Sequence, residues 1–296
     1  MPDTIAQLLH SAAVTLRAAG VDTPEHDAKL LLAHAAGIEP RDIDMLTLMG
    51  RDLPESFAPA AYDAMIARRA AREPLQYIVG TAPFRYLEVE VGPGVFIPRP
   101  ETEIVVQTGL DWLTDNDIRA PRVVDLCAGS GIIGLSVVSE MPASEVWAVE
   151  LSETTYAWTD RNRRKIASEF PGVGERYHLI LGDATAPETL RDLDGTADLV
   201  ITNPPYVPES EIPEQPEVRD HDPDLALYGG SADGLRIPER IIDRAATLLR
   251  DGGALVMEHD ISQGEALRDY ALAHGFSEAR TGDDLTGRPR YLFSLK

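Results

Sequence analysis

Cysteine is almost absent from the sequence, which has one, Cys127, in 296 residues. A single thiol cannot form a disulfide within the chain, and neither it nor the seven scattered histidines show the spacing of a metal site. We therefore expect no metal. The sequence also lacks a run of eighteen apolar residues, and no basic stretch leads into an apolar one after Met1. These absences predict neither a membrane span nor a secretory signal, and favour a cytoplasmic location.

Basic side chains are scarce as well. The 27 Lys and Arg are outnumbered by 49 Asp and Glu, for a net charge of −22, which opposes attraction to the phosphates of nucleic acid. Residues 1–85 carry 8 basic and 11 acidic groups, so most of the excess lies in residues 86–296. We interpret the excess as a solubilising surface, with attraction to a basic partner as the alternative.

The first part of the chain has a helical pattern. Apolar residues from Ile5 to Leu16 recur at helical spacing and stop at Gly20, and Thr23-Pro24 is typical of a helix start. Further helices are expected at 24–36, 41–49 and 55–72, with no strand between them. The sequence therefore predicts a small all-helical domain over residues 1–85.

A hairpin or linker is expected at 86–103, followed by an α/β domain over 104–296. Apolar strand-like segments and helix-like segments alternate there, which favours a mostly parallel sheet wrapped by helices. The expected strands are Arg122–Leu126, Glu145–Glu150, His178–Leu181, Asp198–Thr202 and Ala254–Glu258, and the expected helices are 101–114, 131–140, 152–168, 236–250 and 262–274. Residues 206–235 form a long Pro- and Gly-rich stretch without periodicity, a length typical of a functional or mobile loop.

A glycine-rich turn follows the first of these strands, in Asp125-Leu126-Cys127-Ala128-Gly129-Ser130-Gly131. Glycines let the backbone approach a ligand closely, and ligands of open α/β sheets bind at the carboxyl ends of strands. Glu150 ends the second strand, where its carboxylate can accept both ribose hydroxyls, and Asp183 ends the third, where it suits an adenine amino group. The pattern fits NAD and S-adenosylmethionine equally. Cys127 is interpreted as a small side chain of the turn, since no basic partner is evident to activate it.

Asn203-Pro204-Pro205-Tyr206, at the end of the fourth strand, decides between the two cofactors. Prolines make this loop stiff and present carbonyl oxygens in place of N–H donors. A planar amide nitrogen attacks a sulfonium methyl group poorly unless acceptors hold its N–H groups in line, and the Asn203 side-chain oxygen and the Pro204 carbonyl can do so. Tyr206 can stack on the planar acceptor. The loop therefore favours methyl transfer to an amide-type nitrogen.

With these motifs the chain resembles the release factor glutamine methyltransferases, over nearly its whole length. The resemblance lies in seven segments: Arg72–Gly80, Phe96–Glu103, Asp125–Gly131, Asn203–Tyr206, Asp222–Gly230, Asp233–Leu235 and Asp284–Arg290. The Asn-Pro-Pro-Tyr tetrapeptide alone marks only amino-methyltransferases. Its combination with Pro98-Arg99-Pro100-Glu101-Thr102-Glu103 and the helical domain is more specific.

The resemblance implies a Rossmann-like S-adenosylmethionine-dependent methyltransferase domain with a mostly parallel seven-stranded sheet. It implies transfer to the glutamine of the Gly-Gly-Gln motif of peptide chain release factors, supporting translation termination, with S-adenosylhomocysteine as product. Residues 1–85 are expected to help recognise the release factor. The chain departs from the family pattern at Glu150, where many relatives have aspartate, and at Ala184, where some have an aromatic residue.

The expected site has three overlapping sets of residues. The catalytic residues are Asn203, Pro204 and Tyr206, and the same three with Pro205 bind substrate. The cofactor is expected to contact Asp125, Cys127, Ala128, Gly129, Ser130, Gly131, Glu150, Asp183, Ala184 and Asn203. No stable nucleic-acid binding and no membrane association are expected.

Three other functions remain open at this point. A nucleic-acid adenine methyltransferase would use the same loop on a flipped base, but the net charge is against it, and the arginines at 68, 69 and 72 are interpreted as a solvated helix face. An NAD-dependent oxidoreductase leaves the Asn-Pro-Pro-Tyr loop without a task. A non-catalytic binding protein of the same fold leaves both motifs unexplained.

Overall fold

The structure is a computed structural model that describes residues 4–296, and it divides into two compact units. Residues 1–3, on which the expectation about a signal segment partly rests, lie outside the described residues. The helical unit takes in residues up to Thr81 and the segment Pro213–His221, and the α/β unit takes in Ala82–Ile212 and Asp222–Lys296. The segment Pro213–His221 therefore packs with the helical unit, although it lies between strands of the other unit in the sequence.

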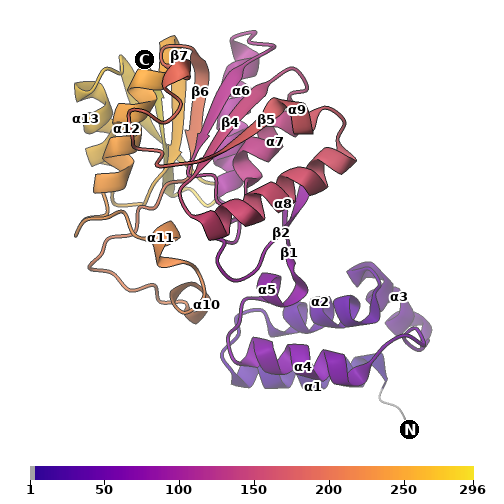
Figure 1. Cartoon of the computed structure of the whole chain (residues 1–296). Helices are drawn as coiled ribbons and strands as arrows, with labels where there is room; N and C mark the ends of the chain where they lie inside the picture. The colour runs from indigo at the N-terminus through magenta and orange to yellow at the C-terminus, as the bar shows by residue number, and fades with distance from the viewer. Residues whose placement is uncertain (1–3) are drawn as a thin grey trace. The chain divides into compact units, whose positions relative to one another are not determined.

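Between Thr4 and Thr81 the helical unit contains four longer helices and a short fifth (Figure 1): α1 (Ile5–Ala18), α2 (Pro24–Ala36), α3 (Pro40–Met49), α4 (Pro59–Ala70) and α5 (Leu75–Val79). Gln7 and Thr4 form a reciprocal capping box at the start of α1, and Gly37 ends α2 in the left-handed conformation. Side chains such as Leu16, Leu31 and Tyr62 make an apolar core between the helices. The four helices expected from the sequence are confirmed, and α5 is too short for periodicity to reveal.

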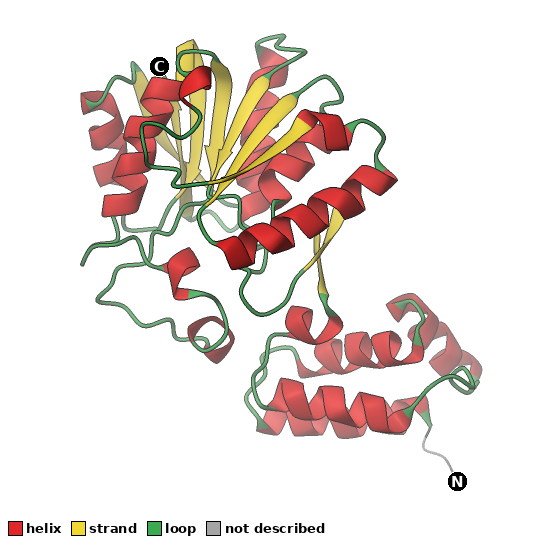
Figure 2. Cartoon of the chain, in the orientation of Figure 1, coloured by secondary structure: helices red, strands yellow, loops and turns green. Residues whose placement is uncertain are grey.

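The α/β unit is built on a sheet whose strands are yellow in Figure 2. The sheet has seven strands in the order β5-β4-β3-β6-β7-β9-β8. Its strands are β3 (Arg122–Leu126), β4 (Glu145–Glu150), β5 (Tyr177–Leu181), β6 (Ala197–Thr202), β7 (Leu249–Glu258), β8 (Glu278–Asp283) and β9 (Pro289–Leu295). The strands from β5 to β7 pair in parallel, and β9 pairs antiparallel with both β7 and β8. The Rossmann-like, mostly parallel seven-stranded sheet implied by the resemblance is confirmed. A separate hairpin of β1 (Thr81–Phe84) and β2 (Leu87–Glu90) precedes it.

Helices pack on both faces of this sheet. The unit contains α6 (Thr102–Asp115), α7 (Ile132–Glu140), α8 (Glu153–Glu169), α9 (Val173–Arg176), η1 (Arg191–Leu193), α11 (Asp224–Leu227), α12 (Arg236–Leu248) and α13 (Gly264–Ala273), while α10 (Pro216–Arg219) belongs to the helical unit. Val200 of β6 packs in one core with residues of α12 and α13, whereas its neighbours Leu199 and Ile201 approach Gly109 of α6. Side chains alternate along a strand, so α6 covers the face opposite to α12 and α13.

Sheet burial explains the strand sequences. Residues Leu199–Ile201 and Ala254–Met257 are 0 % exposed, as expected for parallel strands covered on both sides. Because β3, β6 and β7 are parallel neighbours, their carboxyl ends, at Leu126, Thr202 and Glu258, lie at one edge of the sheet. The chain segments that follow these strands carry the motifs singled out in the sequence.

Candidate functional site

The turn after β3 adopts a conformation that brings its backbone to the edge of the sheet. Gly129 and Gly131 have φ angles of 58° and 86°, and Cys127 also lies in the left-handed region at 66°. A Cβ atom at Gly131 would lie 2.8 Å from Thr159 Cγ2, so a side chain there would collide as well as strain the backbone. The glycine turn is therefore required by both conformation and packing.

Asp125 stabilises this turn from the protein interior. Its Oδ2 accepts a hydrogen bond of 2.9 Å from the Gly134 N–H, at the start of α7, and the side chain is fully buried. Burial raises the pKa of Asp125 from 3.8 to about 8, against the lowering effect of that hydrogen bond, and Glu150 nearby raises it further. Asp125 thus holds the glycine turn in place and has no exposed surface to offer a ligand.

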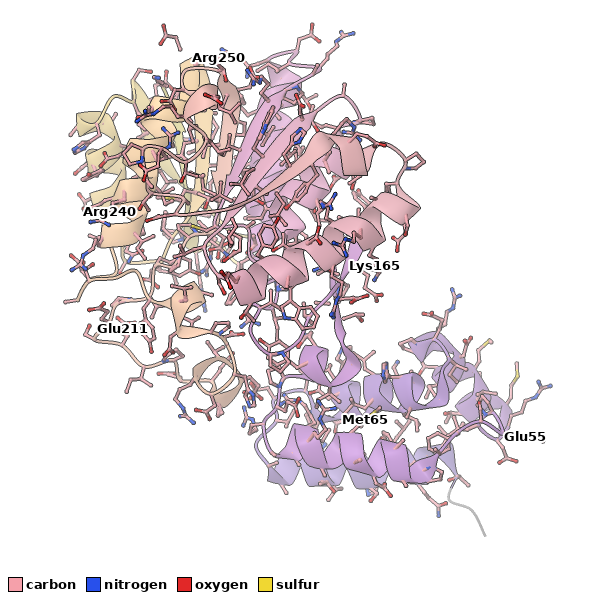
Figure 3. The ribbon with its side chains drawn as sticks, viewed as in Figure 1. Glu55, Met65, Lys165, Glu211, Arg240 and Arg250 are labelled. Carbon is pink, nitrogen blue, oxygen red and sulfur yellow. The ribbon has the colours of Figure 1, made fainter. Side chains whose placement is uncertain are left out.

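A cavity of about 500 Å³ opens beside the turn and is lined by both motifs. Its volume is within the range of small-molecule sites. Eight of the expected cofactor-binding residues line it, namely Cys127, Ala128, Gly129, Ser130, Glu150, Asp183, Ala184 and Asn203, together with Pro205 and Tyr206 of the expected substrate site. Asp125, Gly131 and Pro204 are not among the lining residues. Arg240 of α12, labelled in Figure 3, is a lining residue that sequence analysis did not select.

Two carboxylates in the cavity wall carry its negative charge. Glu150 is 7 % exposed, and its oxygens accept hydrogen bonds from the Gly129 and Ser152 N–H groups at 2.9 and 2.8 Å. Burial raises the pKa of Glu150, and these backbone donors oppose the shift. Asp183 Oδ1 accepts from both the N–H and the hydroxyl of Thr185. A carboxylate has about four acceptor positions, so both groups can still accept from a ligand.

Burial settles the chemistry of Cys127. It raises the pKa of the thiol, and the neighbouring carboxylates Glu150 and Asp125 raise it further. A thiol kept protonated is a poor nucleophile, in agreement with its interpretation as a small side chain of the turn.

The Asn203–Tyr206 loop presents two oxygens without protein partners. Within residues 4–296, neither Asn203 Oδ1 nor the Pro204 carbonyl accepts a hydrogen bond, whereas Asn203 Nδ2 donates to Thr102 Oγ1 at 3.3 Å. Pro204 itself is buried, and Asn203 is half-buried in the cavity wall. Both oxygens therefore keep their capacity to accept a hydrogen bond.

Two residues of the site, Thr102 and Glu258, were not selected from the sequence. The Thr102 hydroxyl donates to Glu258 Oε2 at 2.7 Å, and the Tyr206 hydroxyl donates to Glu258 Oε1 at 3.0 Å. Met257 of β7 pairs with Thr202 of β6, so Glu258, the last residue of β7, lies next to Asn203. The available signals were weak, being a glutamate at a strand end and the threonine of Pro-Glu-Thr-Glu.

The long loop after Tyr206 folds back, so that its later residues are hydrogen-bonded to its first residues. The N–H groups of Tyr206 and Val207 both donate to the Leu227 carbonyl, at 3.1 and 2.8 Å. Gln263 Nε2 donates to the carbonyls of Tyr206 and Asp233, at 2.8 and 2.9 Å. The stretch 206–235 expected from the sequence is therefore a loop with two short helices and several fixed points.

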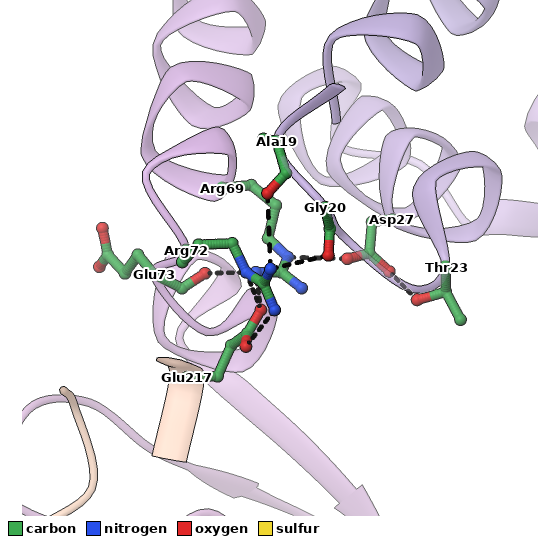
Figure 4. Close-up of polar contacts among 8 residues, drawn as sticks. All are labelled: Ala19, Gly20, Thr23, Asp27, Arg69, Arg72, Glu73 and Glu217. Atoms are coloured by element: carbon green, nitrogen blue, oxygen red, sulfur yellow. Dashed lines mark hydrogen bonds and ion pairs between the residues drawn. The ribbon is translucent and has the colours of Figure 1, made fainter. Parts of the chain in front are cut away.

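The middle of this loop is held in the helical unit by arginines (Figure 4). Glu217 accepts hydrogen bonds from Arg72 Nε and Nη2 and from Arg69 Nη1, all at 2.7 Å, and Arg69 Nε donates to Asp27. Arg69 is 7 % exposed. The interpretation of these arginines as a solvated helix face is therefore wrong for Arg69 and Arg72, because carboxylates separated from them in the sequence fold against them.

No group of three or more His, Cys, Asp or Glu in residues 4–296 is arranged to hold a metal ion. None of the helices described is both long and apolar enough to traverse a bilayer.

Family models match two overlapping parts of the sequence. One described as "PrmC N-terminal domain" matches residues 7–80, and one described as "Conserved hypothetical protein 95" matches residues 75–218. The first covers most of the helical unit, and the second includes both the glycine turn and the Asn203–Tyr206 loop.

Curated relatives match nearly the full length. The chain is 63% identical over 291 residues to the "Release factor glutamine methyltransferase" of Bifidobacterium longum, covering 98% of this chain and 99% of that protein. It is 43% identical to the protein of the same name from Streptomyces coelicolor, covering 94% and 93% of the two chains. It is also 38% identical to a "4-amino-L-phenylalanine/4-methylamino-L-phenylalanine methyltransferase" of Streptomyces pristinaespiralis, covering 86% and 83%.

A solved structure shares the fold at low identity. A methyltransferase from Pyrococcus furiosus is 14% identical with a TM-score of 0.50, over 79% of this chain and 97% of that one.

Proposed function

The chain belongs to the family of release factor glutamine methyltransferases, and from this premise we propose its substrate, cofactor and site. The protein is a methyltransferase. We propose that it transfers the methyl group of S-adenosylmethionine to the side-chain amide nitrogen of the glutamine in the Gly-Gly-Gln motif of peptide chain release factors. In this proposal it acts in the cytoplasm and supports translation termination.

The volume of the cavity and its hydrogen-bond acceptors suit S-adenosylmethionine. The 500 Å³ beside a glycine turn gives room for a nucleoside, and Glu150 ends β4 where a carboxylate can accept ribose hydroxyls. Asp183 and Ala184 lie at the end of the next strand, where they would meet the adenine. When bound, S-adenosylmethionine supplies a methyl carbon on a sulfonium sulfur, which leaves as a neutral thioether.

The observation that carries the proposed acceptor is the pair of unpartnered oxygens, Asn203 Oδ1 and the Pro204 carbonyl. A primary amide has two N–H groups and a delocalised lone pair. With one N–H held by each oxygen, the nitrogen is fixed along the direction of attack. As the nitrogen gains a bond to carbon it becomes positive, so both dipoles stabilise the transition state more than the ground state.

No strong base is required in this scheme. The nitrogen lone pair forms the new N–C bond, the C–S electron pair remains on sulfur, and the nitrogen then loses one proton to solvent. Tyr206 lines the cavity, and burial with the neighbouring Glu258 raises its pKa well above the ordinary value. Tyr206 therefore stays neutral and serves as an aromatic surface for the planar acceptor.

The experiment is methyl transfer from labelled S-adenosylmethionine to a purified release factor. We expect label on the Gly-Gly-Gln glutamine and none on a release factor in which that glutamine is replaced by alanine. Bare DNA is expected to remain unlabelled. Transfer only to DNA adenine would overturn the proposed substrate in favour of the nucleic-acid alternative.

A second acceptor class is favoured by one comparison. The relative from Streptomyces pristinaespiralis is named for methylation of an arylamine, whose nitrogen lone pair is also delocalised into a planar system. The same two oxygens could hold such an NH₂ group. A parallel reaction with 4-amino-L-phenylalanine distinguishes the two, and turnover of the amine without turnover of the release factor would favour the second candidate.

A further inference from the structure

The side chain of Asn203 can be placed in two ways, with its oxygen and NH₂ group exchanged. Only one orientation leaves Oδ1 available to accept from a substrate N–H. In the other, an NH₂ group would face the substrate NH₂ group, donor against donor. Something in the protein must therefore fix the orientation.

The single proton of the Thr102 hydroxyl fixes the orientation of the Asn203 amide. A hydroxyl has one proton, and that of Thr102 points to Glu258 Oε2 at 2.7 Å. Towards Asn203, 3.3 Å away, Thr102 can then act only as an acceptor. The Asn203 NH₂ group must face Thr102, and Oδ1 is left on the other side of the planar amide.

Glu258 keeps the Thr102 proton in place. It is 1 % exposed, Thr102 is 3 % exposed, and both Glu258 oxygens accept from hydroxyls, one from Thr102 and one from Tyr206. Water therefore does not compete for these bonds, and a buried network with each partner satisfied is rigid. The hydrogen bonds all donate in one direction, from the Asn203 NH₂ group to Thr102 and from the Thr102 hydroxyl to Glu258.

The surroundings of Glu258 include groups that raise its pKa and groups that lower it. Burial raises its pKa, and Glu101 at the start of α6 adds to this effect. The two hydroxyl donors and Arg290 of β9 lower it. The ionised form is the one that only accepts, and it is the form that gives the network its direction.

We propose that Thr102 and Glu258 are positioning residues for methyl transfer, which lock the Asn203 amide with Oδ1 presented to the acceptor nitrogen. This inference rests on the proposed function, because it assigns Oδ1 the role of holding a substrate N–H. Neither residue needs to touch the substrate.

The first test compares Thr102→Val, which removes the hydroxyl at nearly constant volume, with Thr102→Ser, which keeps it. We expect kcat on the release factor to fall about 10- to 100-fold in Thr102→Val, with KM and the Kd for S-adenosylhomocysteine within about twofold of wild type. Thr102→Ser should recover most of the activity. Thr196→Val, which removes a hydroxyl at the opposite end of β6, is the matched control and should keep wild-type kcat.

A double variant separates positioning from a general loss of structure. If Thr102 acts through Asn203, then Thr102→Val should cause no further loss in an Asn203→Ala background, measured in single-turnover reactions. Glu258→Met removes the acceptor of the Thr102 proton by another route and should show the same dependence. Wild-type kcat in a folded Thr102→Val or Glu258→Met protein, or additive losses, would overturn the inference.

A spectroscopic readout is independent of the substrate. In ¹⁵N-labelled protein, the Asn203 side-chain NH₂ signal is identified by its disappearance in Asn203→Ala. We expect this signal to shift in Thr102→Val and Glu258→Met and to stay in place in Thr196→Val; an unmoved signal contradicts the inference. A shifted signal in a protein that does not methylate release factors would leave the network intact and reject the proposed substrate.

Discussion

At the scale of single residues, the proposed site depends on two oxygen atoms that accept no hydrogen bond from the described protein. Asn203 Oδ1 and the Pro204 carbonyl accept nothing from residues 4–296, while the Asn203 NH₂ group and the Tyr206 hydroxyl both donate to protein oxygens. In the proposed function these two oxygens receive the two N–H groups of a planar amide.

Asn203→Ala should lower kcat strongly, to a residual rate that single-turnover reactions still measure, and largely spare cofactor binding. The variant removes one of the two acceptors, and loss of one such group costs about 100- to 1,000-fold in kcat. Single-turnover methylation and calorimetric titration with S-adenosylhomocysteine measure the two effects. Asn116→Ala, at the exposed end of α6, is the control. A wild-type rate in Asn203→Ala would contradict the role of this residue.

Asp125 should make stability depend on pH. Its pKa is raised from 3.8 to about 8 in the folded protein, with Glu150 and the Tyr177 ring nearby, so the folded state keeps a proton that the unfolded state has lost. Its contribution to stability is then full below pH 4 and declines as pH rises to about 8, by at most about 1.4 kcal/mol per pH unit.

Denaturant unfolding of Asp125→Asn at several pH values measures this effect. Asparagine keeps an acceptor for the Gly134 N–H without the charge, so its stability relative to wild type should grow between pH 4 and 8. The exposed Asp251→Asn should leave the pH dependence unchanged. A stability difference that is flat with pH would contradict the assignment.

The sequence predicts the residues that lie within motifs, and misses those that join the site through the fold. The glycine turn and the Asn203–Tyr206 loop each act within a few consecutive residues, so spacing reveals them. Thr102 and Glu258 reach Asn203 only because α6 begins where β6 and β7 end. Asp125 was selected as a cofactor contact because it precedes the turn. In the structure its side chain is fully buried and accepts a hydrogen bond from the Gly134 N–H.

At the scale of elements, the long loop after β6 is held at several points along its length. Its ends are bound to the backbone around Tyr206 and to Gln263, and its middle is held by Arg69 and Arg72 through Glu217. Periodicity cannot reveal α10 or α11, because each has four residues. The strands β8 and β9 were also not assigned from the residues, since their partly exposed, mixed pattern lacks the apolar run of the central strands.

Removing the Glu217 carboxylate should loosen this loop. Glu217→Ala leaves Arg69 and Arg72 without their shared acceptor, and hydrogen bonds to charged groups contribute about 1.5–3 kcal/mol each. We expect several-fold faster proteolysis within residues 206–222, mapped by mass spectrometry, and a lower free energy of unfolding.

Glu214→Ala is the matched control for this prediction, because it removes an exposed glutamate from the same segment. It should be cleaved at the wild-type rate. Equal cleavage of the Glu217→Ala and Glu214→Ala proteins would show that the arginine contacts do not hold the loop.

At the scale of the whole molecule, charge separates the acceptor classes. With a net charge of −22, the protein should not bind duplex DNA in a mobility-shift assay even at about 50 mM salt, where phosphate contacts are strongest. The three arginines at 68, 69 and 72 do not form a free basic surface, because each is paired with a glutamate. Salt-sensitive DNA binding at micromolar protein would contradict this view and restore the adenine alternative.

The most direct measurement is a crystal structure with S-adenosylhomocysteine and a release factor bound. We predict that the side-chain NH₂ group of the Gly-Gly-Gln glutamine lies within about 3 Å of both Asn203 Oδ1 and the Pro204 carbonyl, with its nitrogen directed at the sulfur. A glutamine held by other groups, or an Asn203 oxygen turned towards Thr102, would contradict the account.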